Sequence, residues 1–408
     1  MILPLLKINY TYKRKQYFIE KSLYVFFLIF MVLLFSVKRG IATKEFYIVT
    51  IFFIVHSFYN SHAYKNIFSN KVYLLSIVLI LYSVISSMVV GRIELDYIKY
   101  GFRLIVFLTI MLFYLKRKHE MFTLFKIVVL ATVVGSGYDL FNYISSGSYQ
   151  RSLPFGVDSK FLIQIYAGGI FSITAIISAH LAVMGRSRIE KILYSLSCVY
   201  LSTLVYLSQS RAAILCYLLS IVIYILLSKR VKVKHGLITL LTFSLIFTFI
   251  NNHIYKFTSL LARKDSGRLE IWALSLDILK DKALFGHGLG EDFLLKTSVG
   301  SFTEPHNLYL YAIFTGGMVC LLLLLILYWM AIKAVFHNWC PDLGPFMAAI
   351  LLFIITFNFF DSRMIVDDIG VGWHLFWFPI GLIAVFASLQ GSVKDEVSID
   401  NPCNMKGS

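Results

Sequence analysis

Three short stretches of the sequence place a cationic or protonatable side chain at the predicted start of a helix. They are Arg211 in "SQSRAAIL", Arg268 in "SGRLEIW" and His306 in "PHNLYLY". A helix N-terminus offers unpaired N–H groups and a partial positive charge to an anion, and Arg adds a planar fork of donors suited to phosphate. A neutral imidazole can accept the proton of a hydroxyl. If the three helix starts converge, these residue types predict a site for a diphosphate beside a general base.

Each of these side chains also has a simpler explanation. A lone Arg at a helix end often only snorkels or sets topology, and a lone His beside a membrane helix is often a packing residue. An Arg inside a membrane segment costs about 2.5–3.5 kcal/mol at the centre, so it usually has a partner. Asp139, near the outer end of its predicted helix, is a candidate partner. Trp272, on the same helix face as Arg268, is either a supporting residue or an interfacial anchor.

The three stretches require helices that begin close to these residues. The segment 265–282 has the pattern of an amphipathic helix, with an apolar stripe of Leu269, Trp272, Ala273, Leu276 and Leu279. We expect N-terminal caps from Ser208 or Ser210, from Asp265 or Ser266, and from Ser301 or Thr303, respectively. Pro305 is tolerated in a first helical turn, so the third helix is expected to include it.

The composition predicts the surroundings of this chemistry. Of 408 residues, 58% are hydrophobic and only 15% are charged, too few charges to cover a soluble domain of this length. The net charge of +16 falls in short basic runs between apolar stretches. That pattern is an orientation signal of membrane proteins, and it argues against a nucleic-acid partner. The chain is therefore expected to be polytopic and in contact with membrane lipids.

The apolar runs predict an all-α protein with about twelve transmembrane helices, because barrel strands would alternate in polarity. We expect one integral membrane domain over residues 1–408, and eleven helices is the alternative count. The runs are 22–37, 46–59, 72–91, 100–115, 121–143, 161–184, 189–208, 210–228, 236–255, 306–330, 344–360 and 372–389. The first run follows a basic segment, and no small-residue cleavage site follows the run, so we expect a retained helix.

The positive residues predict the orientation. With both termini in the cytoplasm, the inner segments hold about twice as many Lys and Arg as the short outer loops. Residues 256–305 then form one large loop on the outer side with balanced charges. Long polar loops in an otherwise short-looped chain are where function tends to lie.

Other groups of residues carry weaker signals. "FGHGLG" (285–290) reads as backbone geometry, with His287 as a loop residue, because no strand precedes it. The adjacent acids Asp367 and Asp368 lack further metal ligands, so no metal site is predicted. The spacing of Asp96, Lys99 and Arg103 suggests that they pair with one another.

The ordered set "SQSRAAIL", "SGRLEIW" with "FGHGLG", and "PHNLYLY" resembles the O-antigen ligase and Wzy-type polymerase superfamily of bacterial inner-membrane GT-C glycosyltransferases. The resemblance covers roughly residues 195–330. "SRAA" replaces the "SRGA" of many relatives, a small departure. The set does not by itself distinguish a ligase from a polymerase; the closeness of the three motifs favours a ligase.

The resemblance implies a metal-independent transfer without a cofactor on the periplasmic face. The donor is O-antigen on undecaprenyl diphosphate, and the acceptor is a sugar hydroxyl of lipid A–core in a ligase or another lipid-linked repeat in a polymerase. It implies that Arg211 and Arg268 bind the diphosphate and that His306 is the base. Trp272, Asn307 and Asp139 are supporting candidates.

A twelve-helix transporter or a lipid-glycan flippase is the alternative of a different class. Such proteins place charged or helix-breaking residues near the bilayer midplane, often in two related halves. Here the informative residues lie at predicted outer helix ends, and the two halves show no relation. This distribution favours the glycosyltransferase.

Overall fold

A computed structural model of the chain describes residues 2–36, 39–59, 67–90, 94–145, 164–231, 267–291, 294–298, 300–361 and 365–391. These residues form long apolar helices, a short antiparallel hairpin and a π-helical turn at Trp373–Trp377. The helices are α1 Ile2–Ser36, α2 Arg39–Tyr59, α3 Lys71–Val89, α4 Leu95–Tyr114, α5 Lys118–Ser145, α6 Gln164–Met184, α7 Arg188–Leu207, α8 Arg211–Leu227, α11 Arg268–Leu279, α12 Leu308–His337, α13 Gly344–Phe360 and α14 Phe378–Gly391.

The predicted class, an all-α multi-pass membrane protein, is confirmed. Seven helices of the described residues are long and apolar enough to cross a membrane, and three shorter apolar helices accompany them. The predicted span 189–208 forms α7, whereas the predicted span 236–255 lies outside the described residues. The total of twelve therefore stays a prediction.

The helices α8 and α13 pack against each other in antiparallel fashion. The side chains of Cys216 and Thr356 lie close together near one end of the pair. At the other end, the guanidinium of Arg230, just after α8, lies 2.6 Å from the carboxylate of Asp342, just before α13. These two contacts fix the register of the pair along its whole length.

The helix α12 is folded back on itself. Gly317 has non-helical backbone angles (φ 68°, ψ −167°) and divides α12 into a first arm, 308–316, and a second arm, 318–337. The rings of Tyr309 and Tyr328 are 6.1 Å apart, although a straight helix would separate these residues by roughly 28 Å. The first arm therefore turns its N-terminus back toward the bundle.

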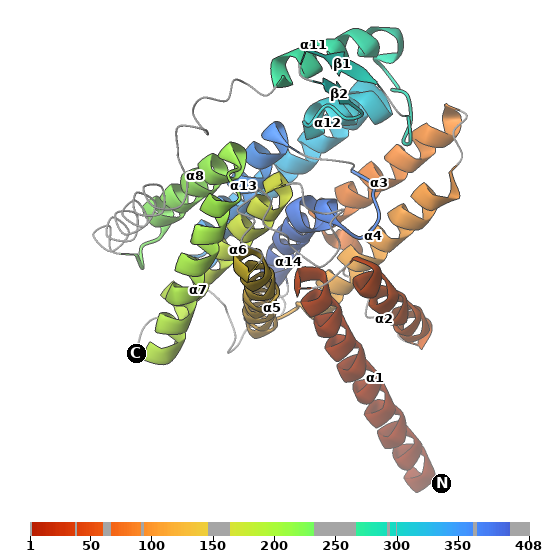
Figure 1. The fold of residues 1–408 in the computed structure, drawn as a ribbon. Coiled ribbons are helices and arrows are strands. Elements are labelled where there is room, and N and C mark those ends of the chain that lie inside the picture. Colours follow the sequence, from red (N-terminus) through yellow and green to blue (C-terminus); the bar gives the residue numbers. More distant parts are fainter. Residues whose placement is uncertain are drawn as a thin grey trace.

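The helix α11 and the hairpin of β1 (Leu295–Thr297) and β2 (Gly300–Phe302) gather at one end of the molecule, above the start of α12 (Figure 1). The carboxylate of Glu270 on α11 accepts hydrogen bonds from the backbone N–H and hydroxyl of Ser298 in the hairpin turn. These bonds join the hairpin to α11.

The expected N-cap of α11 is wrong, and its apolar stripe does not coincide with its buried face. Its buried residues are Ile271, Ser275 and Leu279, whereas Leu269 and Leu276 of the predicted stripe are exposed. Arg268 and Trp272 are half-buried. The N-cap is Gly267, in the left-handed region without a side-chain cap, and not Asp265 or Ser266.

Candidate functional site

Arg268 and His306 lie on either side of a carboxylate, that of Asp361. A guanidinium nitrogen of Arg268 is 3.6 Å from Asp361 Oδ2, and His306 Nδ1 is 3.4 Å from Asp361 Oδ1. The three residues come from the start of α11, the loop before α12 and the end of α13. Two of the predicted site residues are thus brought together by a third residue that the sequence did not indicate.

Asp361 is fully buried, and neither of its carboxylate oxygens accepts a hydrogen bond from the described residues. A buried charge with only loose partners is uncommon in folded proteins, and such groups concentrate at functional sites. Sequence reasoning missed Asp361 because it follows the apolar run of α13 as a single acid. The only available signal was its predicted position at the same outer face as Arg268 and His306.

Arg211 is placed by the register of α8 and α13. It is the first residue of α8, with Ser210 as the N-cap whose hydroxyl accepts a hydrogen bond from the Ala213 N–H, as expected. Arg211 precedes Cys216 by as many positions as Asp361 follows Thr356. In the antiparallel pair, Arg211 at the start of α8 therefore lies at the same end as Asp361 after α13.

His306 is held just outside the helix rather than within it. Asn307 is the N-cap of α12, and its side-chain oxygen accepts hydrogen bonds from the N–H groups of Tyr309 and Leu310. The backbone of His306 has φ 49°, a left-handed conformation that ordinary residues seldom adopt and that is found at functional sites. The predicted caps Ser301 and Thr303 and a helical Pro305 are therefore wrong.

The Asn307 cap sets the start of α12. An Asn side chain supplies the acceptor for the first helical N–H groups, so the helix begins after it. Ser301 pairs in β2 instead. Asn307 thus stabilises the helix start directly after His306.

Trp272 connects α11 to the backbone of the same loop. Its indole N–H donates to the carbonyl of Pro305 at 3.1 Å, and its ring packs against Phe359 at 5.3 Å. Trp272 therefore contacts both Pro305, which precedes His306, and α13, which ends just before Asp361. Asp139, the remaining supporting candidate, lies in α5 with its side chain outside the described residues.

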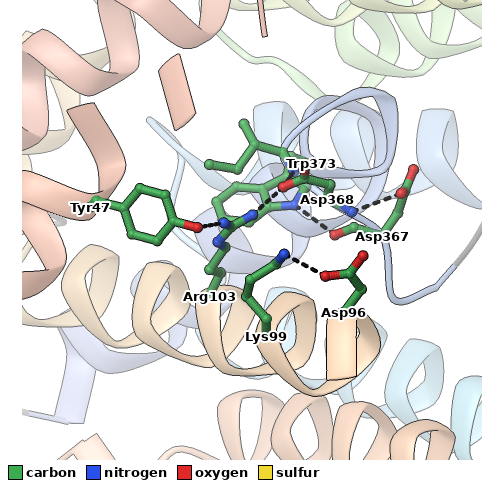
Figure 2. Close-up of polar contacts among 8 residues, drawn as sticks. Tyr47, Asp96, Lys99, Arg103, Asp367, Asp368 and Trp373 are labelled. Atoms are coloured by element: carbon green, nitrogen blue, oxygen red, sulfur yellow. Dashed lines mark hydrogen bonds and ion pairs between the residues drawn. The ribbon is translucent and has the colours of Figure 1, made fainter. Parts of the chain in front are cut away.

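The acidic residues of the 365–372 segment form a separate cluster (Figure 2). The guanidinium of Arg103, nearly fully buried in α4, pairs with the carboxylate of Asp368 and donates to the hydroxyl of Tyr47. Lys99 pairs with Asp96 at 2.5 Å, so the expectation holds for these two and is wrong for Arg103. No group of three or more His, Cys, Asp or Glu side chains among the described residues could hold a metal ion.

The arrangement at Asp361 allows a defined acid–base role. An imidazole that keeps its proton on Nδ1, facing Asp361, presents the lone pair of Nε2 on its opposite side. The guanidinium of Arg268 has further N–H donors besides the one nearest Asp361. The site therefore combines a proton acceptor with donors for an anion.

Residues 196–325 match the sequence model of the O-antigen ligase family. That segment of the chain is therefore similar to the O-antigen ligase family. The matched segment contains Arg211, Arg268 and His306. An O-antigen ligase of Pseudomonas aeruginosa strain PAO1 is 27% identical over 122 residues, which is 30% of each chain. The match thus spans less than a third of that relative.

Proposed function

We propose that this protein is an O-antigen ligase, transferring O-antigen polysaccharide from undecaprenyl diphosphate to a sugar hydroxyl of lipid A–core. The observation that supports this proposal most directly is the convergence of Arg268 and His306 on the buried carboxylate of Asp361. The antiparallel packing of α8 against α13, with Arg211 at the same end as Asp361, supports a second guanidinium for the site. Such a site fits a substrate with a diphosphate next to a reacting hydroxyl.

The chemistry follows from these groups. Arg211 and Arg268 bind the diphosphate and stabilise the negative charge that develops as it leaves. His306 Nε2 takes the proton of the acceptor hydroxyl while its oxygen attacks the anomeric carbon. The bond from that carbon to the diphosphate breaks, a glycosidic bond forms, and undecaprenyl diphosphate is released. Asp361 holds the Nδ1 proton of His306 and stabilises the imidazolium that results.

The orientation inferred from the basic residues supports a location in the bacterial inner membrane, with both termini cytoplasmic. The site would then face the periplasm, where lipid-linked O-antigen and lipid A–core are both at the membrane surface. A Wzy-type polymerase would use the same donor with another lipid-linked repeat as acceptor. Only the acceptor differs between the two reactions.

A lipopolysaccharide gel of a deletion strain separates these reactions. For a ligase we expect bare core, accumulation of lipid-linked polymer, and restoration of the ladder by the plasmid-borne gene. Core bearing a single repeat would instead identify a polymerase and overturn the ligase assignment. The purified protein should also transfer glycan to lipid A–core from lipid-linked donor.

A further inference from the structure

The segment 283–290, which we call the glycine segment, enters the bend of α12. The N–H groups of His287 and Gly288 donate to the carbonyls of Phe314 and Thr315, at 2.8 and 2.9 Å. In return, the N–H of Met318 donates to the carbonyl of Ala283 at 2.8 Å. The backbone groups that the interruption of α12 leaves without helical partners are therefore satisfied by this segment.

Two glycines make this contact possible. Gly286 (φ 71°) and Gly317 (φ 68°) both lie in the left-handed region. A Cβ on Gly286 would be 2.6 Å from the backbone nitrogen of Gly317, and a Cβ on Gly317 would collide with the carbonyl of Leu284. Because the neighbouring atoms are backbone, neither position has room for a side chain unless the segment moves.

The helix α3 contributes three polar side chains to the same junction. The hydroxyl of Tyr82 donates to the Gly316 carbonyl at 2.7 Å, and that of Ser86 donates to the Phe285 carbonyl at 3.0 Å. The hydroxyl of Ser87 accepts a hydrogen bond from the N–H of Leu289. One membrane helix thus contacts both the vertex of α12 and the glycine segment.

We infer that the glycine segment positions the two reacting groups of the transferase relative to each other. It follows α11, whose first residue is Arg268, and it sets the vertex of the arm 308–316, whose N-terminal side carries His306. A shift at this junction therefore changes the position of the guanidinium relative to the imidazole. Displacements of about 1 Å at a reacting group can cost on the order of 100-fold in rate.

This inference rests on the proposed function, since it concerns the geometry of that site. The residues of the junction position others and touch no substrate themselves. A residue that only stabilised the fold would lower the amount of active protein and leave the KM for the donor unchanged. A positioning residue changes kcat and KM together.

The test measures transfer by purified, monodisperse protein, with rates expressed per folded molecule and lipid-linked O-antigen as the varied substrate. For Gly317→Ala we expect kcat to fall by at least about 10-fold and the donor KM to rise severalfold. The matched control is Gly40→Ala, because no atom lies within 4 Å of a Cβ at that position. We expect Gly40→Ala to match the wild type.

A second variant keeps the inference testable if Gly317→Ala does not fold. Tyr82→Phe combined with Ser86→Ala removes two hydroxyls without adding atoms. We expect at least about a threefold fall in kcat together with a rise in the donor KM. Unchanged kcat and KM in the folded double variant, or a fall in kcat alone, would overturn the inference. Inactive wild-type protein would contradict the proposed function instead.

Discussion

At the residue scale, the site depends on a buried negative charge between two groups that do not form hydrogen bonds to it. The separations of 3.4 and 3.6 Å leave Asp361 loosely paired. Hydrogen bonds of catalytic groups are often long in apo structures and shorten when substrate is bound. An anion at Arg268 would compete for the guanidinium and leave Asp361 to His306.

Asp361→Asn tests the orienting role of the carboxylate. The amide keeps the shape but can donate to Nδ1 of His306, which favours the wrong tautomer. We expect transfer to fall by about 10²–10⁴-fold with donor binding within a few-fold of wild type. Asp277→Asn, an exposed acid on α11, is the matched control and should be unaffected. Activity near normal in Asp361→Asn would exclude this role.

His306→Ala removes the proposed base. Transfer should be lost by at least about 10²-fold, while affinity for undecaprenyl diphosphate persists because both arginines remain. Binding of radiolabelled donor and a transfer assay, both on the same preparation, measure the two effects separately. His337→Ala, at the far end of α12, provides the control. Full transfer by His306→Ala would show that the base is another group.

Arg268→Lys tests recognition of the diphosphate. The substitution keeps the charge and removes the planar fork, so we expect most of the transfer activity to be lost and donor binding to weaken. Arg230→Lys is the matched control, since this Arg pairs with Asp342 at the opposite end of α8. Near-normal transfer by Arg268→Lys would count against a diphosphate clamp.

At the element scale, the ends of α11, α12 and α13 are held together by contacts away from the chemistry. Trp272 contacts both the Pro305 carbonyl and Phe359, and the glycine segment fixes the bend of α12. The hydrogen bonds among these contacts act on backbone groups and so set the direction of the backbone. The arrangement explains how a loop residue with a left-handed backbone, His306, is held in one place.

The pair formed by Arg103 and Asp368 has a stability role in this arrangement. Asp368→Asn leaves a buried guanidinium without its carboxylate, so we expect a loss of about 3–5 kcal/mol in unfolding free energy. The pair of Asp96 and Lys99 is exposed, so Asp96→Asn should cost at most about 1 kcal/mol. Thermal unfolding in detergent compares the stabilities of the two variants. Equal losses would show that burial of Arg103 does not matter.

At the scale of the whole molecule, the proposed function requires that α11 and the hairpin face the periplasm. Lys296 in β1 and Lys229 after α8 are both exposed. In a background without native cysteines, Lys296→Cys should react with an impermeant maleimide in cells whose outer membrane is permeabilised. Lys229→Cys should react only after lysis. The reverse labelling pattern would overturn the predicted orientation.

The sequence alone determined the class of the protein and much of its candidate chemistry. Hydropathy predicts spanning helices because a lipid environment forces the backbone to satisfy its own hydrogen bonds. Arg211, Arg268 and His306 were found because cations at helix starts oppose the helix dipole, which is unusual without a bound anion. The Ser210 cap was predictable because a Ser hydroxyl readily accepts a hydrogen bond from the first helical N–H groups.

The tertiary structure decided where these groups meet. Asp361 is one acid after an apolar helix, and only the packing of α13 against α8, α11 and α12 brings it to Arg268 and His306. The break of α12 at Gly317 was also hidden, because residues far apart in the chain supply the missing backbone partners. Local patterns record propensities, whereas a buried ion cluster and a bent helix are stabilised by contacts between distant segments, and those contacts exist only in the folded chain.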